Sequence, residues 1–426
     1  MKTKSRTVIS HHQDESGLRH LPLVDLLVDT KTELLELALR SGLKVFTTML
    51  EEDRKAICGP RYAHEPDRQA SRAGTVRSEV VLGGRKVAIR RPRARTAEGE
   101  VPLPTFQAMA KTDPLDRRVV EQMLVGVATR QYARSLEPLD ATMESRGTSK
   151  STVSRRFVAR TRVQLETWQA RALDDLAVAV LLLDGVHVGD HCLIVALAVT
   201  EDGTKHALGL WEGATENSTV CQSLLANLQS RGLRTDRSLL VILDGAKALR
   251  KAVRETFGEA ALVQRCQIHK LRNVLDHLPE RQRPWVKAIL QRAYWSDDIA
   301  TAKRLLQDLA RRLDADHPSA AQSVREGLEE TLTIIGLRLS PSLRRSLSTT
   351  NAAESLISRT RHVKRNVKRW RGGQMVVRWV AAGVLEAVKG FRRLKGHKEM
   401  PKLVAALRAR DQQLGLASRE RIGEVA

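Results

Sequence analysis

Residues 178–185 read Val-Ala-Val-Leu-Leu-Leu-Asp-Gly, and residues 239–245 read Leu-Leu-Val-Ile-Leu-Asp-Gly. Each stretch is a short apolar run that ends in a turn signal, which is the pattern of a buried strand. A carboxylate at the end of a buried strand is costly unless it is paired or holds a metal ion. We therefore expect Asp184 and Asp244 to lie together at the ends of two strands of one sheet. The alternative is that each Asp only caps a turn or the next helix.

The segments around these two stretches indicate an α/β fold. Strand-like runs at 191–199 and 206–211 follow the first stretch, and a run at 261–265 follows the second. Helical patterns occupy 216–231 and 246–257. Three sequential strands followed by alternating helices and strands are typical of a mixed sheet.

A third acid, Glu354, stands in the segment Asn-Ala-Ala-Glu at 351–354 and precedes a basic segment that we expect to be helical. The cations of this segment that we expect to contact DNA are Arg359, Arg361, Lys364, Arg365 and Lys368. A helix that packs across the sheet would bring the third carboxylate to the other two. Three converging carboxylates hold two divalent cations, and two such ions support in-line attack on a phosphodiester. These residues therefore predict a protein that cuts and joins nucleic acid.

The composition agrees with a polyanionic partner. The chain has 426 residues, with 72 Lys and Arg against 49 Asp and Glu, and a formal charge of +23. Such a balance favours binding to phosphates, although a soluble protein with a generally basic face would show it as well. The longest apolar run, at 176–183, is far too short to span a membrane. Four widely spaced cysteines and a polar N-terminus fit a cytoplasmic, nucleoid-associated protein.

The N-terminal part is expected to hold two small domains behind a helical and linker region at 1–74. Alternating runs around Gly83 and Gly84 predict a β-hairpin at 75–105. The arginines at the end of this hairpin either contact a DNA backbone or minor groove, or form a charged segment that is exposed to solvent. These cations are Arg90, Arg91, Arg93 and Arg95.

Residues 112–170 are expected to form a helix-turn-helix-like DNA-binding domain. Helical patterns cover about 114–127, 132–143 and 151–165, with a Gly-containing turn at 147–150. The last helix would present Lys150, Thr152, Arg155 and Arg156 to the major groove. Any three-helix bundle would show the same spacing.

Residues 264–275 read Gln-Arg-Cys-Gln-Ile-His-Lys-Leu-Arg-Asn-Val-Leu. With the two Asp-Gly stretches, the segment at 351–354 and the Gly-Ala-x-Glu-Asn run at 213–217, this segment resembles the prokaryotic Mutator-type insertion-sequence transposases of the DDE family. The resemblance covers about residues 110–390. It implies an RNase H-like catalytic domain at 175–277 and 346–395, interrupted by an all-helical insertion at 278–345. A polar tail at 396–426 is expected to be partly mobile.

By this resemblance Asp184, Asp244 and Glu354 are the catalytic triad and the ligands of two Mg²⁺ ions, with Mn²⁺ as a substitute. The implied activity is binding of terminal inverted repeats, phosphodiester hydrolysis, and strand transfer into target DNA. Two ends must be held together, so at least a homodimer is expected. The alternatives are a domesticated DNA-binding protein that does not cleave, and another RNase H-like nuclease such as a junction resolvase.

Other residues near these motifs are also candidates for a role at the site. Cys266 and His269 form a Cys-x-x-His pair, but a zinc site needs two more ligands, and the resemblance implies a near-site motif that packs or positions DNA. Lys270 and Arg272 are expected to contact phosphates. Trp295, in the insertion, either stacks on a displaced base or packs in a core.

Overall fold

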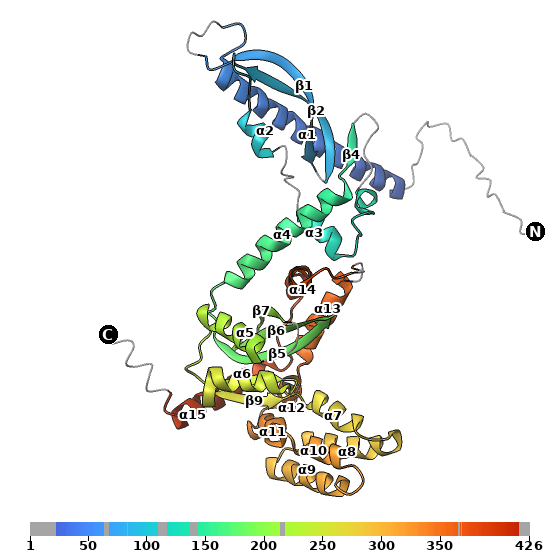
Figure 1. Ribbon diagram of the computed structural model, residues 1–426, viewed down its shortest axis with the longest axis vertical. Coiled ribbons are helices and arrows are strands. Elements are labelled where there is room, and N and C mark those ends of the chain that lie inside the picture. The colour runs from blue at the N-terminus through green and yellow to red at the C-terminus, as the bar shows by residue number, and fades with distance from the viewer. Residues whose placement is uncertain are drawn as a thin grey trace, which may run out of the picture. The chain divides into compact units, whose positions relative to one another are not determined.

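The computed structural model describes residues 23–63, 68–82, 84–109, 117–136, 144–213, 218–364, 367 and 369–416. The chain divides into two compact units (Figure 1). Unit 1 contains the residues up to Arg118 and Gln131–Ser149, and unit 2 contains Val119–Arg130 and the chain from Lys150 onward. The predicted segment at 112–170 therefore contributes to both units. None of the described helices is both long enough and apolar enough to cross a membrane.

Unit 1 is a β-hairpin packed on a long helix. Its elements are α1 (Leu23–Cys58), β1 (Ser71–Leu82), β2 (Arg85–Arg95), β3 (Glu100–Val101), α2 (Pro104–Met109), the 3-10 helix η1 (Tyr132–Ser135) and β4 (Ser145–Gly147). Strands β1 and β2 pair antiparallel, so the alternating runs do form the predicted hairpin. Val80 of β1 packs with Phe46 and Leu50 of α1 and with Leu103 in a small buried core. Alternation along the strands places this apolar face against the helix.

The helices expected between 114 and 165 differ from the prediction in length or in kind. The first, α3 (Arg117–Leu124), ends earlier than expected, and the last, α4 (Lys150–Ala170), is longer than expected. The described start of the middle one is only the 3-10 helix η1, after which Leu136 is extended. Residues 137–143 lie outside the described part of the chain. Gly147, expected in a turn, instead belongs to β4, which pairs with β2.

Unit 2 is built on a mixed sheet of five strands, as the sequence predicted. They are β5 (Val178–Val188), β6 (His191–Thr200), β7 (Lys205–Gly213), β8 (Leu239–Leu243) and β9 (Ala261–Arg265), in the order β7-β6-β5-β8-β9. The first three form an antiparallel meander, and β8 and β9 run parallel to β5. One expectation is corrected here. Strand β5 does not end before Asp184 but continues to Val188, with Asp184 opposite Val195 of β6.

Both faces of this sheet are covered by helices. Helices α5 (Ser218–Ser230) and α6 (Lys247–Phe257) cover one face, where Leu181, Leu183 and Leu243 are buried. Val180 and Leu182 point into the core on the opposite face, which is shared with α13 (Asn351–Lys364) and α14 (Gly373–Val388). The two-residue period of a strand explains why its neighbours alternate between two cores. This burial on both faces is why the strand sequences are almost uniformly apolar.

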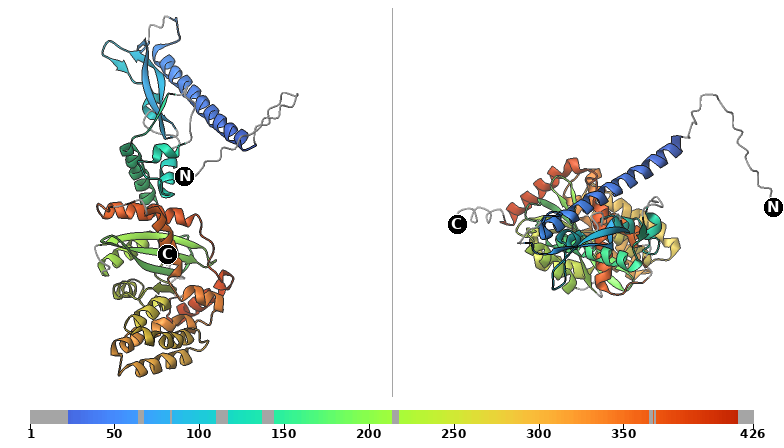
Figure 2. Two further views of the ribbon diagram at one scale, coloured as in Figure 1. Left: turned by 90° about the vertical axis from the view of Figure 1, so that its right-hand side faces the viewer. Right: turned by 90° about the horizontal axis from the view of Figure 1, so that it is seen from above.

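Between β9 and α13 the chain forms a bundle of helices, which is coloured yellow to orange in Figure 2. They are α7 (Gln267–Asp276), the 3-10 helix η3 (Glu280–Gln282), α8 (Arg283–Tyr294), α9 (Ile299–Leu313), α10 (Pro318–Arg325), α11 (Leu328–Gly336) and α12 (Pro341–Leu347). Helix α11 lies along the edge strand β9 (Figure 1). The buried amide of Gln264 donates to the carbonyl of Thr331 at 3.1 Å and accepts from the amide of Ile334 at 2.7 Å. This side chain fastens the insertion to the sheet.

The C-terminal segment differs from the mobile tail that the sequence suggested. Residues 397–399 form the 3-10 helix η4 (His397–Glu399), and α15 (Met400–Gln413) follows. Met400, Leu403 and Leu407 are buried in the same core as the sheet. The spacing of these three residues is that of one face of a helix, although the segment as a whole is polar. Residues 417–426 lie outside the described part.

We predict that Gln264→Leu lowers the free energy of unfolding of unit 2 by about 2 kcal/mol, because it removes two buried hydrogen bonds that the Gln264 amide makes with the main chain of Thr331 and Ile334. Urea unfolding followed by circular dichroism measures the change. Gln291→Leu, on the exposed side of α8, is the control and should change stability by less than about 0.5 kcal/mol. Equal effects of the two substitutions would contradict the role of Gln264.

Candidate functional site

The register of two parallel strands brings Asp184 and Asp244 together. Leu183 of β5 pairs with Leu243 of β8, so the two acids that follow occupy neighbouring positions on adjacent strands. Adjacent strands lie about 4.8 Å apart. Asp184 is buried, with 4% of its surface exposed, and Asp244 is partly buried. Alternation directs Asp184 to the face of the sheet that α13 covers, and Asp244 directly follows the last residue of β8.

Glu354 reaches this face from the first turn of α13, which packs against β5. The helix begins where the hydroxyl of Thr349 accepts a hydrogen bond from the amide of Asn351. The amide of Glu354 donates to the carbonyl of Thr350 at 3.0 Å. The carboxylate of Glu354 is one third exposed, whereas Asp184 is buried.

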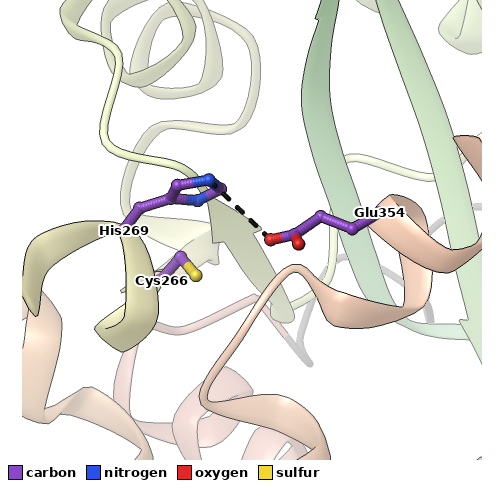
Figure 3. A group of neighbouring side chains, drawn as sticks. All are labelled: Cys266, His269 and Glu354. Atoms are coloured by element: carbon purple, nitrogen blue, oxygen red, sulfur yellow. Dashed lines mark ion pairs between the residues drawn. The ribbon is translucent and has the colours of Figure 1, made fainter. Parts of the chain in front are cut away.

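The hydroxyl of Thr350 joins Glu354 to the Cys-x-x-His pair. Its oxygen lies 3.2 Å from Oε1 of Glu354, 3.5 Å from Sγ of Cys266 and 3.4 Å from Nδ1 of His269. The amide of Thr350 also donates to the same sulfur at 3.4 Å. Nε2 of His269 forms an ion pair of 3.7 Å with Glu354, drawn as a dashed line in Figure 3. The pair is therefore part of one hydrogen-bonded cluster with the third acid.

This cluster is arranged for hydrogen bonding rather than for zinc. Single ligand atoms of Cys266, His269 and Glu354 lie within 4.8 Å of one another. Zinc in structural sites is held by four ligands, of which this cluster offers three, and the hydroxyl oxygen of Thr350 already lies within hydrogen-bonding distance of all three side chains. Among the described residues, the three acids Asp184, Asp244 and Glu354 do not form a group this tight.

The surroundings place a positive charge beside the acids. The hydrogen bond with Cys266 raises the pKa of His269 to about 9; burial opposes this shift, and the negative charges of Asp184 and Glu354 add to it. Burial acts to raise the pKa of the Cys266 thiol, but the hydrogen bonds from His269 and Thr350 outweigh it and lower that pKa. At neutral pH the imidazole is therefore protonated and faces Glu354.

Three other predicted residues lie close to this region in the sequence but in different environments. Lys270 is 1% exposed, and its ammonium group donates to the main-chain carbonyl of Glu326, so in this arrangement it does not face an external phosphate. Arg272 is exposed, as a phosphate contact requires. Trp295 is 47% exposed, and the guanidinium of Arg345 lies 4.7 Å from its ring centre. Its indole is thus open to an external partner and is not packed in a core.

The predicted DNA-contacting cations fall into two groups in unit 1. Arg90 and Arg95 are exposed. Arg91 and Arg93 instead bind Glu100, at 2.7 and 3.0 Å, and Arg91 also lies over the ring of Phe106. Only the first two are presented to solvent without a described acidic partner.

In unit 2, Lys150 and Arg155 are exposed near the start of α4, and Arg155 lies 3.5 Å from the hydroxyl of Thr152. Arg156 is partly buried on the same helix. Arg359, Arg361 and Lys364 belong to α13, but their side chains lie outside the described part of the structure, as do Arg365 and Lys368 altogether. Their contact with DNA stays a prediction.

Sequence analysis missed Thr350. The residue precedes Glu354 by four positions, which is the spacing of neighbours on a helix. That spacing was available from the sequence, but the proximity of Cys266 and His269, more than eighty positions earlier, was not.

Comparisons with known proteins show the family to which the chain is similar. The family described as "Transposase, Mutator family" matches residues 24–393. The chain is 33% identical over 171 residues to the transposase for insertion sequence element IST2 of Acidithiobacillus ferrooxidans, covering 40% of this chain and 56% of that protein. It is 30% identical over 215 residues to the transposase for IS6120 of Mycolicibacterium smegmatis, covering 49% and 65%. It is 26% identical over 341 residues to the transposase for ISRM5 of Rhizobium meliloti, covering 78% and 82%. The chain thus spans less than two thirds of the first two relatives.

We predict that Thr350→Val lowers the free energy of unfolding by about 1–2 kcal/mol, because the thiol and the carboxylate lose their shared hydroxyl in a buried setting. Thr350→Ser keeps the hydroxyl and should restore most of this loss. Chemical denaturation of the three proteins tests the point. If serine and valine destabilise the protein equally, the methyl group of Thr350 matters rather than its hydrogen bonds.

Proposed function

Because this chain belongs to the Mutator family of transposases, we propose that it cuts DNA at the terminal inverted repeats of an insertion sequence and joins the freed end to target DNA. The observation that carries the proposal is the pairing of Leu183 with Leu243, which sets Asp184 beside Asp244 on the face that bears Glu354. We assign these three acids as the DDE catalytic triad. The relatives are named as transposases, and no feature of the described residues favours a DNA-binding protein that does not cleave.

The sheet supports assignment of unit 2 to the RNase H-like class. An antiparallel meander of β5, β6 and β7 is followed by two parallel strands, with β5 in the centre. The helix with the third acid follows only after the bundle of helices from α8 to α12. We take the catalytic domain as residues 175–277 and 346–395, and residues 278–345 as an insertion in it.

The chemistry of the donors fits divalent magnesium. A nearly buried carboxylate beside a second one on the neighbouring strand favours a cation, and hard oxygen ligands suit Mg²⁺ or Mn²⁺. Asp184, Asp244 and Glu354 would hold two such ions. When bound, the ions would promote deprotonation of the attacking hydroxyl and stabilise the charge on the leaving oxygen.

The chain's own residues orient the reacting groups. Thr350 fixes the carboxylate of Glu354, and the protonated His269 beside it attracts the anionic phosphate and balances charge that develops at phosphorus. In the first step the oxygen of water attacks phosphorus at the end of the element, and the 3′ oxygen leaves and takes up a proton. In the second step that 3′-hydroxyl attacks a target phosphodiester, whose own 3′ oxygen leaves.

The remaining cations are proposed to hold DNA on the host nucleoid. Exposed side chains of unit 1 and of α4 would bind the terminal repeats, and the basic segment after Glu354 would hold the strand that is cut. The exposed ring of Trp295 would stack on a base displaced during cleavage. Two ends must be joined in one reaction, so we propose at least a homodimer.

We predict that Asp184→Asn abolishes strand cleavage while it leaves DNA binding within about twofold, because the change removes one charge from a buried position of nearly the same shape. A labelled duplex with the inverted repeat that flanks the coding sequence serves as substrate. Cleavage is followed with Mg²⁺ and with EDTA, and binding is followed by mobility shift.

Asp190→Asn, in the turn after β5, is the matched control and should cleave at the wild-type rate. A wild-type protein that binds the repeat but gives no product with Mg²⁺ would refute the proposed activity. Loss of folding in the Asp184→Asn variant, measured by circular dichroism, would assign that residue a structural role.

We predict that Arg90→Ala weakens binding to the repeat and lowers the slope of log affinity against log salt by about one, because an exposed cation releases one counterion at a phosphate. Arg91→Ala is the contrast. It should destabilise unit 1 by about 1 kcal/mol through loss of Glu100 and Phe106, with little change in the salt slope. Equal slopes for wild type and Arg90→Ala would exclude Arg90 as a phosphate contact.

A further inference from the structure

Arg265, the last residue of β9, lies between two glycines that belong to different parts of unit 2. A Cβ atom on Gly245 would lie 2.2 Å from Nε of Arg265, and one on Gly327 would lie 2.9 Å from its NH1. Gly245 directly follows Asp244, and Gly327 directly precedes α11 in the helical insertion. Both glycines leave room for one guanidinium group.

The guanidinium is buried and tied to the insertion. Only 7% of the Arg265 side chain is exposed. Its NH1 donates to the main-chain carbonyl of Glu326 at 3.0 Å and lies 3.5 Å from the carboxylate of the same residue. Lys270 donates to that carbonyl as well, so two cations meet at the C-terminal end of α10. Cations at this end of a helix are stabilised by its dipole.

The other side of the guanidinium faces the turn that carries Asp244. The carboxylate of Asp244 accepts a hydrogen bond of 2.9 Å from the amide of Ala246, and Gly245 between them has a φ of +108°. Nε of Arg265 has no hydrogen-bond partner among the described residues, although it lies against this turn. A buried N–H group without a hydrogen bond calls for a structural explanation. Packing of this group against the turn indicates that the guanidinium constrains the position of the turn.

We propose that Arg265 is a positioning residue for Asp244, which couples the turn at 244–246 to the corner of the helical insertion at Glu326 and Gly327. The planar group fills the space between the two glycines, so a shift of the corner is transmitted to the turn. Glycine at position 245 is then needed for two reasons. It allows the turn after β8, and it leaves space for the guanidinium, which any larger residue would displace. An effect of Arg265 on DNA cleavage rests on the proposed function. The coupling between the turn at 244–246 and the corner at Glu326 and Gly327 does not.

The test compares two glycines that both have a positive φ but differ in their surroundings. Gly327→Ala places a methyl group against Arg265, at a φ of +64° and a ψ of +30°. Gly258→Ala is the control, because Gly258 has a φ of +55° and a ψ of −134° and nothing within 4 Å of its Cβ position, so that its methyl group adds backbone strain without a side-chain contact. Arg265→Lys is the second variant, since lysine keeps the charge and the reach to Glu326 but lacks the planar group that lies on Gly245.

Amide hydrogen exchange, read by mass spectrometry on a peptide that covers residues 243–248, measures the coupling in the full-length protein. We expect Gly327→Ala and Arg265→Lys to exchange at least about tenfold faster there than Gly258→Ala, since local opening follows the loss of packing. We also expect cleavage of the repeat duplex to slow roughly tenfold with DNA affinity within about twofold, as a small misplacement of a catalytic group predicts.

Exchange at 243–248 that is the same in Gly327→Ala and Gly258→Ala would overturn the proposal. So would faster exchange with an unchanged cleavage rate, because the turn would then move without consequence for Asp244. If the wild-type protein shows no cleavage at all, the proposed function fails, and the exchange measurement still decides whether Arg265 couples the corner to the turn.

Discussion

The parallel pairing of β5 with β8 is the constraint on which the rest of unit 2 depends. Its register sets Asp184 beside Asp244, and the crossover helices that parallel strands require cover one face of the sheet. The opposite face is then left for α13, which brings Glu354 to the same place. A shift of β8 by one residue relative to β5 would turn the side chains of β8 to the other face and move Asp244 away from Asp184.

Two further side chains contact the segments that carry Glu354 and Asp244. Thr350 links Glu354 to the Cys266 and His269 pair, and Arg265 lies against the turn after Asp244. Each of them belongs to a network that connects separate elements of the chain. Carboxylates repel one another when they are close, so acids that lie near each other need such supports. The protonated His269 contributes by lowering the net negative charge near the acids.

The helices between β9 and α13 are firmly attached to the five-stranded sheet. The amide of Gln264 completes hydrogen bonds of α11, and the hydroxyl of Thr333 donates to the carbonyl of Val263 at 2.7 Å. These bonds run along β9, the edge strand, whose outer backbone groups would otherwise be left without partners. The insertion therefore protects the sheet edge, and its exposed Trp295 is carried on a helix bundle anchored next to the acids.

The sequence by itself determined the five strands, both Asp-Gly stretches, the basic helix after Glu354 and the family, because strand periodicity, turn residues and motif order are local properties of the chain. It misjudged the end of β5 at Asp184 and the buried α15, since burial on both sides hides strand ends and a polar composition hides an apolar stripe. Only the tertiary structure decided that Thr350 meets Cys266, that Lys270 is buried and that Arg265 lies between Gly245 and Gly327. These contacts join residues far apart in the chain, and no local pattern records them.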